Sequence, residues 1–149
     1  MNADGRRSSA CACVVLVVVV GLSSIGTAGD EACSTAQRKA LARIPAVRHE
    51  DYKDVLDMQY WRNPYLYVLR DGVELRSAGN GTRTKLTIAE LPRALAGLPQ
   101  AAWPYGRVIG AQDQALGSGD DFRYIEENHK RVDAVMKCLR LQVNWVPSA

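Results

Sequence analysis

Apolar and polar positions follow a clear pattern mainly in the second half of the chain. Tyr65–Arg70 is rich in β-forming residues, Asp71-Gly72 is a strong tight-turn signal, and Val73–Arg76 resumes the alternation. This pattern predicts a β-hairpin. Two further apolar runs, Arg107–Gln112 and Leu141–Val146, predict two more strands.

A helical period marks three other segments. Phe122–Leu139 places Ile125, Val132, Val135, Met136 and Leu139 on one face, with charged residues opposite, which predicts a long amphipathic helix. Thr87 and Glu90 fit a capping box, and leucines at helical spacing follow as far as Gly97, so a second helix is expected there. Ser34–Ile44 predicts a short helix that Pro45 ends.

The resulting order is β-hairpin, helix, strand, helix, strand. This order predicts an α+β or small α/β fold, a two-layer sandwich with the helices on one face of a three- to four-stranded sheet. The structure of residues 46–64 stays open, because their apolar and aromatic side chains follow no single period.

The first residues have the layout of a secretory signal peptide. Arg6 and Arg7 precede the apolar run Ala10–Leu22, and small residues follow up to Ala28, where cleavage is expected. The alternative is a retained single-pass anchor, although the apolar run is short for a spanning helix of about 20 residues. The expected organisation is a signal peptide (1–28), an N-terminal helix and extended arm (29–64), and the sandwich domain (65–149).

Cleavage would leave two cysteines, Cys33 and Cys138. An exported protein with two cysteines is expected to form one disulfide, here between the mature N-terminus and the last helix. The alternative is an unpaired surface Cys33 and a buried Cys138.

The chain has a formal net charge of +3, and its basic residues are scattered among acids, so nothing predicts nucleic-acid binding.

Three segments resemble the periplasmic domain of ExbD/TolR-type biopolymer-transport proteins. They are the hairpin phrase Leu69–Leu75, the helix Thr87–Leu95 and the phrase Pro104–Ile109. The resemblance covers about Tyr65–Val146 and implies a periplasmic domain that binds other proteins or pairs with itself. In that family a membrane helix carries an acidic residue used by the motor, whereas Ala10–Leu22 has none. The family's proline–tyrosine–glycine phrase also opens a helix, while the residues here predict a strand at Arg107–Gln112.

Candidate chemistry is sparse. A small secreted enzyme could use Asp113, Asp120 and His129 for acid–base chemistry. Capping of the last helix explains Asp120 and Asp121 equally well. His129 is expected on the polar side of that helix, as a surface residue. His49 lies in a charged cluster that is interpreted as a solvated face, and no metal or cofactor is expected.

The aromatic residues suggest a binding surface formed by Trp61, Tyr65, Trp103 and Tyr105, although completing the core is the alternative for most of them. The function expected from the sequence is that of an exported, periplasmic or secreted, non-catalytic domain acting through protein–protein contacts in the cell envelope. A small secreted enzyme and a membrane-anchored accessory protein of the ExbD/TolR type are the alternatives. The partner protein is not identified by any motif.

Overall fold

Five strands form one mixed sheet in the order β3-β2-β1-β4-β5 in the computed structural model, which describes residues 32–55, 58–77, 81–115 and 119–147. Neighbours are antiparallel among the first three strands, whereas β4 runs parallel to both β1 and β5. The predicted α+β class is confirmed, with one strand more than expected. The strands are β1 (Tyr65–Leu69), β2 (Gly72–Arg76), β3 (Arg83–Leu86), β4 (Val108–Asp113) and β5 (Gln142–Val146).

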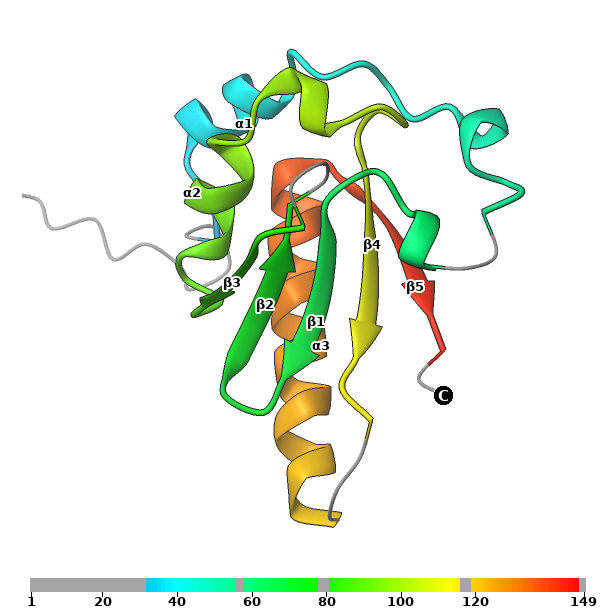
Figure 1. The fold of residues 1–149 in the computed structure, drawn as a ribbon. Helices are drawn as coiled ribbons and strands as arrows, with labels where there is room; N and C mark the ends of the chain where they lie inside the picture. Colours follow the sequence, from blue (N-terminus) through cyan, green and yellow to red (C-terminus); the bar gives the residue numbers. More distant parts are fainter. Residues whose placement is uncertain (1–31, 56–57, 78–80, 116–118, 148–149) are drawn as a thin grey trace, which may run out of the picture.

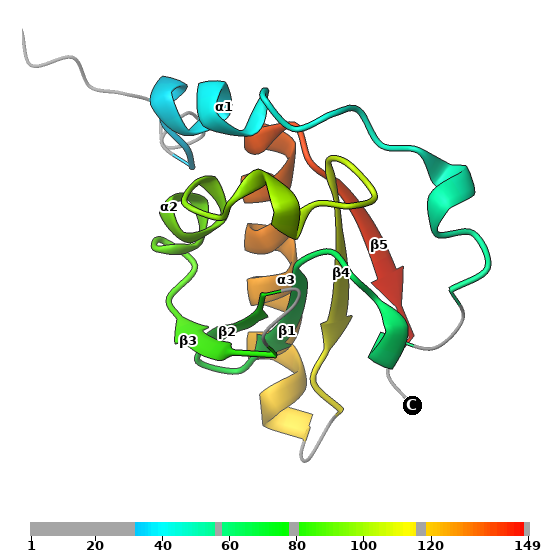
Figure 2. The same cartoon turned by 45° about the horizontal axis from the view of Figure 1, so that its top comes forward.

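Three helices cover one face of this sheet, as predicted. They are α1 (Thr35–Leu41), α2 (Leu91–Ala96) and α3 (Gly119–Leu139). The long helix α3 runs along the back of the sheet in Figure 1, and α1 and α2 lie together near its C-terminal end. Figure 2 shows the same layer with α1 and α2 brought forward. Among the described residues, no helix is both long enough and apolar enough to span a membrane.

The hairpin forms at the predicted place, with a slightly different turn. Leu69 pairs with Gly72, so Arg70 and Asp71 form the loop and Gly72 begins β2. Gly72 has a φ of 142°, and a Cβ there would lie 2.4 Å from the Leu86 carbonyl oxygen. Glycine is required because β3 passes so close to this backbone.

The main core lies between the sheet and the helices. The five predicted core residues of α3 are all buried, and they pack against Leu66 and Val68 of β1 and against Ile109 and Ala111 of β4. These strand residues alternate with others that face away, as expected for β-strands. The apolar stripe of α3 is therefore confirmed as the centre of the core.

The described parts of the open stretch, residues 46–55 and 58–64, cover the opposite face of the sheet. The chain passes over the end of the sheet and along β5, with short 3₁₀ turns at His49–Asp51 and Met58–Tyr60, before it enters β1 (Figure 1). Tyr52 and Trp61 from this arm form an aromatic cluster with Tyr65 and Tyr105.

The expected aromatic binding surface is therefore corrected. Trp61, Tyr65, Trp103 and Tyr105 are between 0 and 6% exposed, so they complete two cores rather than a surface. Trp103 belongs to the helix-side core and the other three to the cluster under the arm.

Asn63 fixes this arm to the turn before β4. Its buried amide donates to the carbonyls of Gly106 (2.8 Å) and Val108 (2.6 Å) and accepts from the Tyr105 N–H (2.8 Å). Gly106 has a φ of 78°, and a Cβ there would lie 2.4 Å from the Ala46 carbonyl oxygen. One side chain thus hydrogen-bonds to three backbone groups of this turn and of the start of β4, and the Gly106 carbonyl also accepts from the Val108 N–H.

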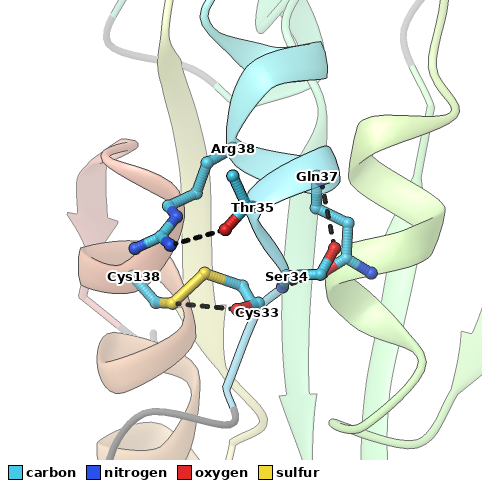
Figure 3. Close-up of a disulfide and its surroundings, with 6 residues drawn as sticks. All are labelled: Cys33, Ser34, Thr35, Gln37, Arg38 and Cys138. Atoms are coloured by element: carbon cyan, nitrogen blue, oxygen red, sulfur yellow. Dashed lines mark hydrogen bonds between the residues drawn. A yellow bond between two sulfur atoms is a disulfide. The ribbon is translucent and has the colours of Figure 1, made fainter.

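The disulfide Cys33–Cys138 joins the start of α1 to the last turn of α3 (Figure 3). Ser34 caps α1, since its hydroxyl accepts from the Gln37 N–H while the Gln37 side chain accepts from the Ser34 N–H. The bridge closes a sequence separation of 105 residues. A loop of that length stabilises the folded state by about 4–5 kcal/mol in the chain-entropy model.

Thr87 does not cap α2 as expected. The helix begins at Leu91 after a turn, and both the N–H and the hydroxyl of Thr87 donate to the Glu90 carboxylate, at 2.9 and 2.8 Å. These hydrogen bonds lower the pKa of Glu90. The threonine hydroxyl is therefore a donor here, which reverses its predicted role.

This geometry gives a specific prediction for two substitutions. Thr87→Ala should cost about 0.5–1.5 kcal/mol, the usual net value of one hydrogen bond. Thr87→Asp should cost more, because its carboxylate would face that of Glu90. Urea midpoints of the two variants measure the difference. A milder effect of aspartate than of alanine would restore the capping interpretation, and equal midpoints would contradict both accounts.

Tyr65 carries a testable pH dependence. Burial, with a further contribution from Tyr67, raises its pKa to about 12, and Arg76 acts in the opposite direction. Above about pH 10 the unfolded chain loses the phenolic proton while the folded protein keeps it. The free energy of unfolding should therefore fall as the pH rises from about 10 to about 12. Tyrosinate absorbance should show a late titration step that Tyr65→Phe removes, and its persistence in that variant would refute the assignment.

Candidate functional site

Asp113 and His129 form a close pair between the sheet and α3. Asp113 is the last residue of β4, and His129 lies in the middle of α3 on the side that faces the sheet. The His129 Nδ1 atom is 3.0 and 2.9 Å from the two Asp113 carboxylate oxygens. Because a carboxylate only accepts, Nδ1 carries the proton that is donated.

The other side of the His129 ring is also occupied. Its Nε2 atom lies 3.6 Å from the Asp133 carboxylate, and its ring stacks on Trp145 with centroids 3.8 Å apart and planes 14° from parallel. The Trp145 indole N–H donates to Asp133 at 3.2 Å, which closes the ring of contacts. The imidazole is therefore held by an acid at each nitrogen and by an aromatic face.

A groove of about 510 Å³ lies beside this pair. Ile125 and the rings of His129 and Phe122 supply its apolar surface, and Phe122 is half exposed although it is the only phenylalanine in the chain. We call this hollow the Phe122 groove. Its lining residues are Asp113, Gln114, Phe122, Ile125, Glu126, His129, Lys130 and Asp133.

Acidic groups dominate the charge of the Phe122 groove. Three carboxylates, those of Asp113, Glu126 and Asp133, face one ammonium, that of Lys130. Lys130 donates to Glu126 at 2.7 Å, and this hydrogen bond lowers the pKa of the Glu126 carboxyl. The groove thus combines exposed apolar surface with an excess of negative charge, which suits a ligand that is both apolar and cationic.

The structure brings together two of the three acid–base candidates. Asp113 and His129 are in contact, so His129 is a half-buried partner of a strand carboxylate and not the surface residue that was expected. Asp120 lies in the first turn of α3, and its side chain falls outside the described part of the structure. Asp121 also lies within that turn, where it pairs with Arg70 at 2.9 Å, so neither aspartate is the residue preceding the helix.

Sequence reasoning missed two members of the site. Asp133 follows His129 by four residues, a spacing that places both on one helix face, so this contact had a detectable signal. Trp145 gave no signal as a partner of His129, because the two rings meet only when β5 turns back beside α3 and pairs with β4. The second histidine, His49, is exposed and lies in a segment where Arg48 pairs with Asp51 and Lys53 with Glu50, as expected of a solvated face.

No cluster of three or more metal-ligating side chains occurs among the described residues. Comparison with known protein families, with curated proteins and with solved structures finds no match to this chain.

Proposed function

We propose that this chain is an exported, non-catalytic domain that acts through contacts with another protein in the cell envelope, and that the Phe122 groove receives a segment of that partner. The observation that carries the proposal is the half-exposed Phe122 beside an apolar floor and three carboxylates. Exposed aromatic residues at the edge of a hollow are typical anchors of protein interfaces.

Binding fits this site better than catalysis. Nucleophilic catalysis by a histidine needs a hydroxyl or thiol within hydrogen-bond reach of its free nitrogen. Among the described residues that line the groove, none is a serine, threonine or cysteine. The nitrogen opposite Asp113 faces a second carboxylate, that of Asp133, rather than an open position. The acids therefore hold the ring in place.

The partner segment should carry an apolar side chain next to a lysine or arginine. The apolar group would pack on Phe122 and Ile125, and the cation would lie among the carboxylates of Asp113, Glu126 and Asp133. A partner with this chemistry is attracted by the charge of the groove, so its association should weaken as salt is added.

Peptide titration monitored by amide NMR shifts tests this proposal. A peptide with alternating leucine and lysine should shift resonances of residues lining the Phe122 groove, and the same peptide with glutamate in place of lysine should not. Phe122→Ala should weaken binding at least tenfold, whereas Tyr60→Ala, at the more exposed Tyr60 on the arm, serves as the matched control. Equal resonance shifts with both peptides, or an equal loss of peptide affinity in the Phe122→Ala and Tyr60→Ala variants, would overturn the proposal.

Export is proposed from the signal-like N-terminus and is supported by the disulfide, because such bonds persist in oxidising compartments. The protein recovered from its cells should have the mass of residues 29–149 and no free thiol after denaturation. A chain that keeps residues 1–28 would favour the anchored alternative, in line with the resemblance to ExbD/TolR-type proteins, and two titratable thiols would contradict the disulfide.

A further inference from the structure

A second hollow, of about 500 Å³, lies at the opposite end of α3. Four basic residues line it, from α1, from the residue preceding β4 and from the residue following α3. Its remaining lining is Thr35 and the small apolar surface of Ala42 and Leu139. We call it the cationic groove, and its basic residues are Arg38, Lys39, Arg107 and Arg140.

Among the residues that the structure describes, the basic side chains of this groove have no acidic partners. No aspartate or glutamate lines it, and within the described residues none of the four forms a salt bridge. Two more basic residues, Arg43 and Lys137, are also exposed, just after α1 and in the last turn of α3.

The cationic groove also lies at the end of the domain where the described chain begins and enters α1. Residue 32 leads directly into α1, and α1 packs beside the C-terminal end of α3 (Figures 1 and 2). The proposed cleavage after Ala28 would leave only residues 29–31 before Ala32, so docking of the mature domain has to rest on the basic side chains themselves.

We propose that the cationic groove and its flanking basic residues dock this end of the domain onto an anionic phospholipid surface. Arg38 donates to the Thr35 hydroxyl at 3.1 Å, but none of the four basic side chains pairs with an acid among the described residues. Basic side chains without acidic partners suit a surface of many mobile phosphates better than one bound anion, which would need oriented donors. Each lysine or arginine near an anionic membrane strengthens binding by about fivefold at moderate salt. This surface is separate from the Phe122 groove, so the proposal does not depend on the proposed function.

The test places a photoreactive benzophenone amino acid at position 42 of the full chain, inside the cationic groove. Ala115, exposed at the far end of β4, is the matched control position. Vesicles contain phosphatidylcholine with or without phosphatidylglycerol. Mass spectrometry of the irradiated protein should show attached lipid from position 42 with the anionic vesicles only, and far less at high salt. An apolar N-terminal run that inserted into the bilayer would bring position 42 to neutral vesicles as well, so the requirement for phosphatidylglycerol separates its contribution from that of the groove.

Charge variants provide the second measurement. Removing three charges with Arg38→Gln, Lys39→Gln and Arg140→Gln should reduce lipid attachment roughly a hundredfold. A control triple variant changes the net charge equally at exposed sites elsewhere and should keep its lipid attachment; it combines Arg62→Gln, Arg93→Gln and Arg123→Gln. Thermal melts check folding, and the single variants Lys39→Gln and Arg140→Gln replace the triple variant if it does not fold.

Several outcomes would overturn the proposal. Equal attachment from positions 42 and 115, or to neutral vesicles, would show that the groove does not select anionic lipid. Full competition by inorganic phosphate at constant ionic strength would indicate a small-anion site instead. Binding of polyglutamate without attachment to anionic vesicles would indicate an acidic protein partner.

Discussion

Replacing Val135 with aspartate is expected to abolish stable folding. Val135 is 4% exposed at the centre of the apolar face of α3, where it packs between the sheet and the other helices. An unpaired charge in such a position costs several kcal/mol. Domains of this size have a total stability of about 5–15 kcal/mol, so most of the folded population should be lost.

The adjacent residue provides the control for this substitution. Ala134 is exposed on the same turn of α3, and Ala134→Asp introduces the same charge into the same helix without burying it. Its melting temperature should stay close to that of the unmodified protein. A cooperative melt of Val135→Asp at the temperature of Ala134→Asp would show that this face of α3 is not the core.

Replacing Asn63 should have the second largest effect. Its side chain is 1% exposed and makes three hydrogen bonds to backbone groups of the turn before β4. Asn63→Ala would leave the Tyr105 N–H and the Val108 carbonyl without the partner that Asn63 supplies, at a cost of about 1–3 kcal/mol for each buried group left unsatisfied. The Gly106 carbonyl would still accept from the Val108 N–H. Asn63→Asp should be at least as harmful, because a carboxylate cannot donate to the carbonyls of Gly106 and Val108.

Denaturant midpoints of these variants measure the effect directly. Arg62→Ala, at the exposed neighbouring residue, should change the midpoint little. In Asn63→Asp, hydrogen exchange should also increase at the backbone amides of the arm and of the turn that Asn63 connects. If Asn63→Asp were as stable as the unmodified protein, the arm would not be held by this side chain.

The elements that sequence reasoning predicted are those with a strong local pattern. The hairpin, α3 and β5 each contain a regular alternation or a helical stripe, so short windows of sequence were sufficient. The strand β3 was missed because Arg83, Thr84 and Lys85 are exposed and carry no apolar alternation. It pairs with β2 at the edge of the sheet, where a strand needs few buried side chains.

The site was harder to predict, because it depends on contacts between distant residues. Asp113 and His129 meet only when α3 packs on the end of β4. The sequence pointed to both as acid–base candidates of an alternative enzyme, but it did not place them in contact. The aromatic residues Trp61, Tyr65, Trp103 and Tyr105 have the composition of a binding surface, but the arm covers one side of the sheet and buries three of them. Burial of this kind follows from the path of residues 46–64, which no periodicity indicated.

The central claim, that this domain acts through a partner bound at the Phe122 groove, is tested most directly by photocrosslinking in the cells that make the protein. A photoreactive amino acid at position 122 should form a covalent adduct with another protein, and the same group at position 60 should not. Adding Asp113→Asn and Asp133→Asn to the position-122 protein should remove the adduct, since the cationic side chain of the partner would lose its counterions. An identical adduct pattern from both positions, or an adduct unaffected by removing the two charges, would contradict the claim.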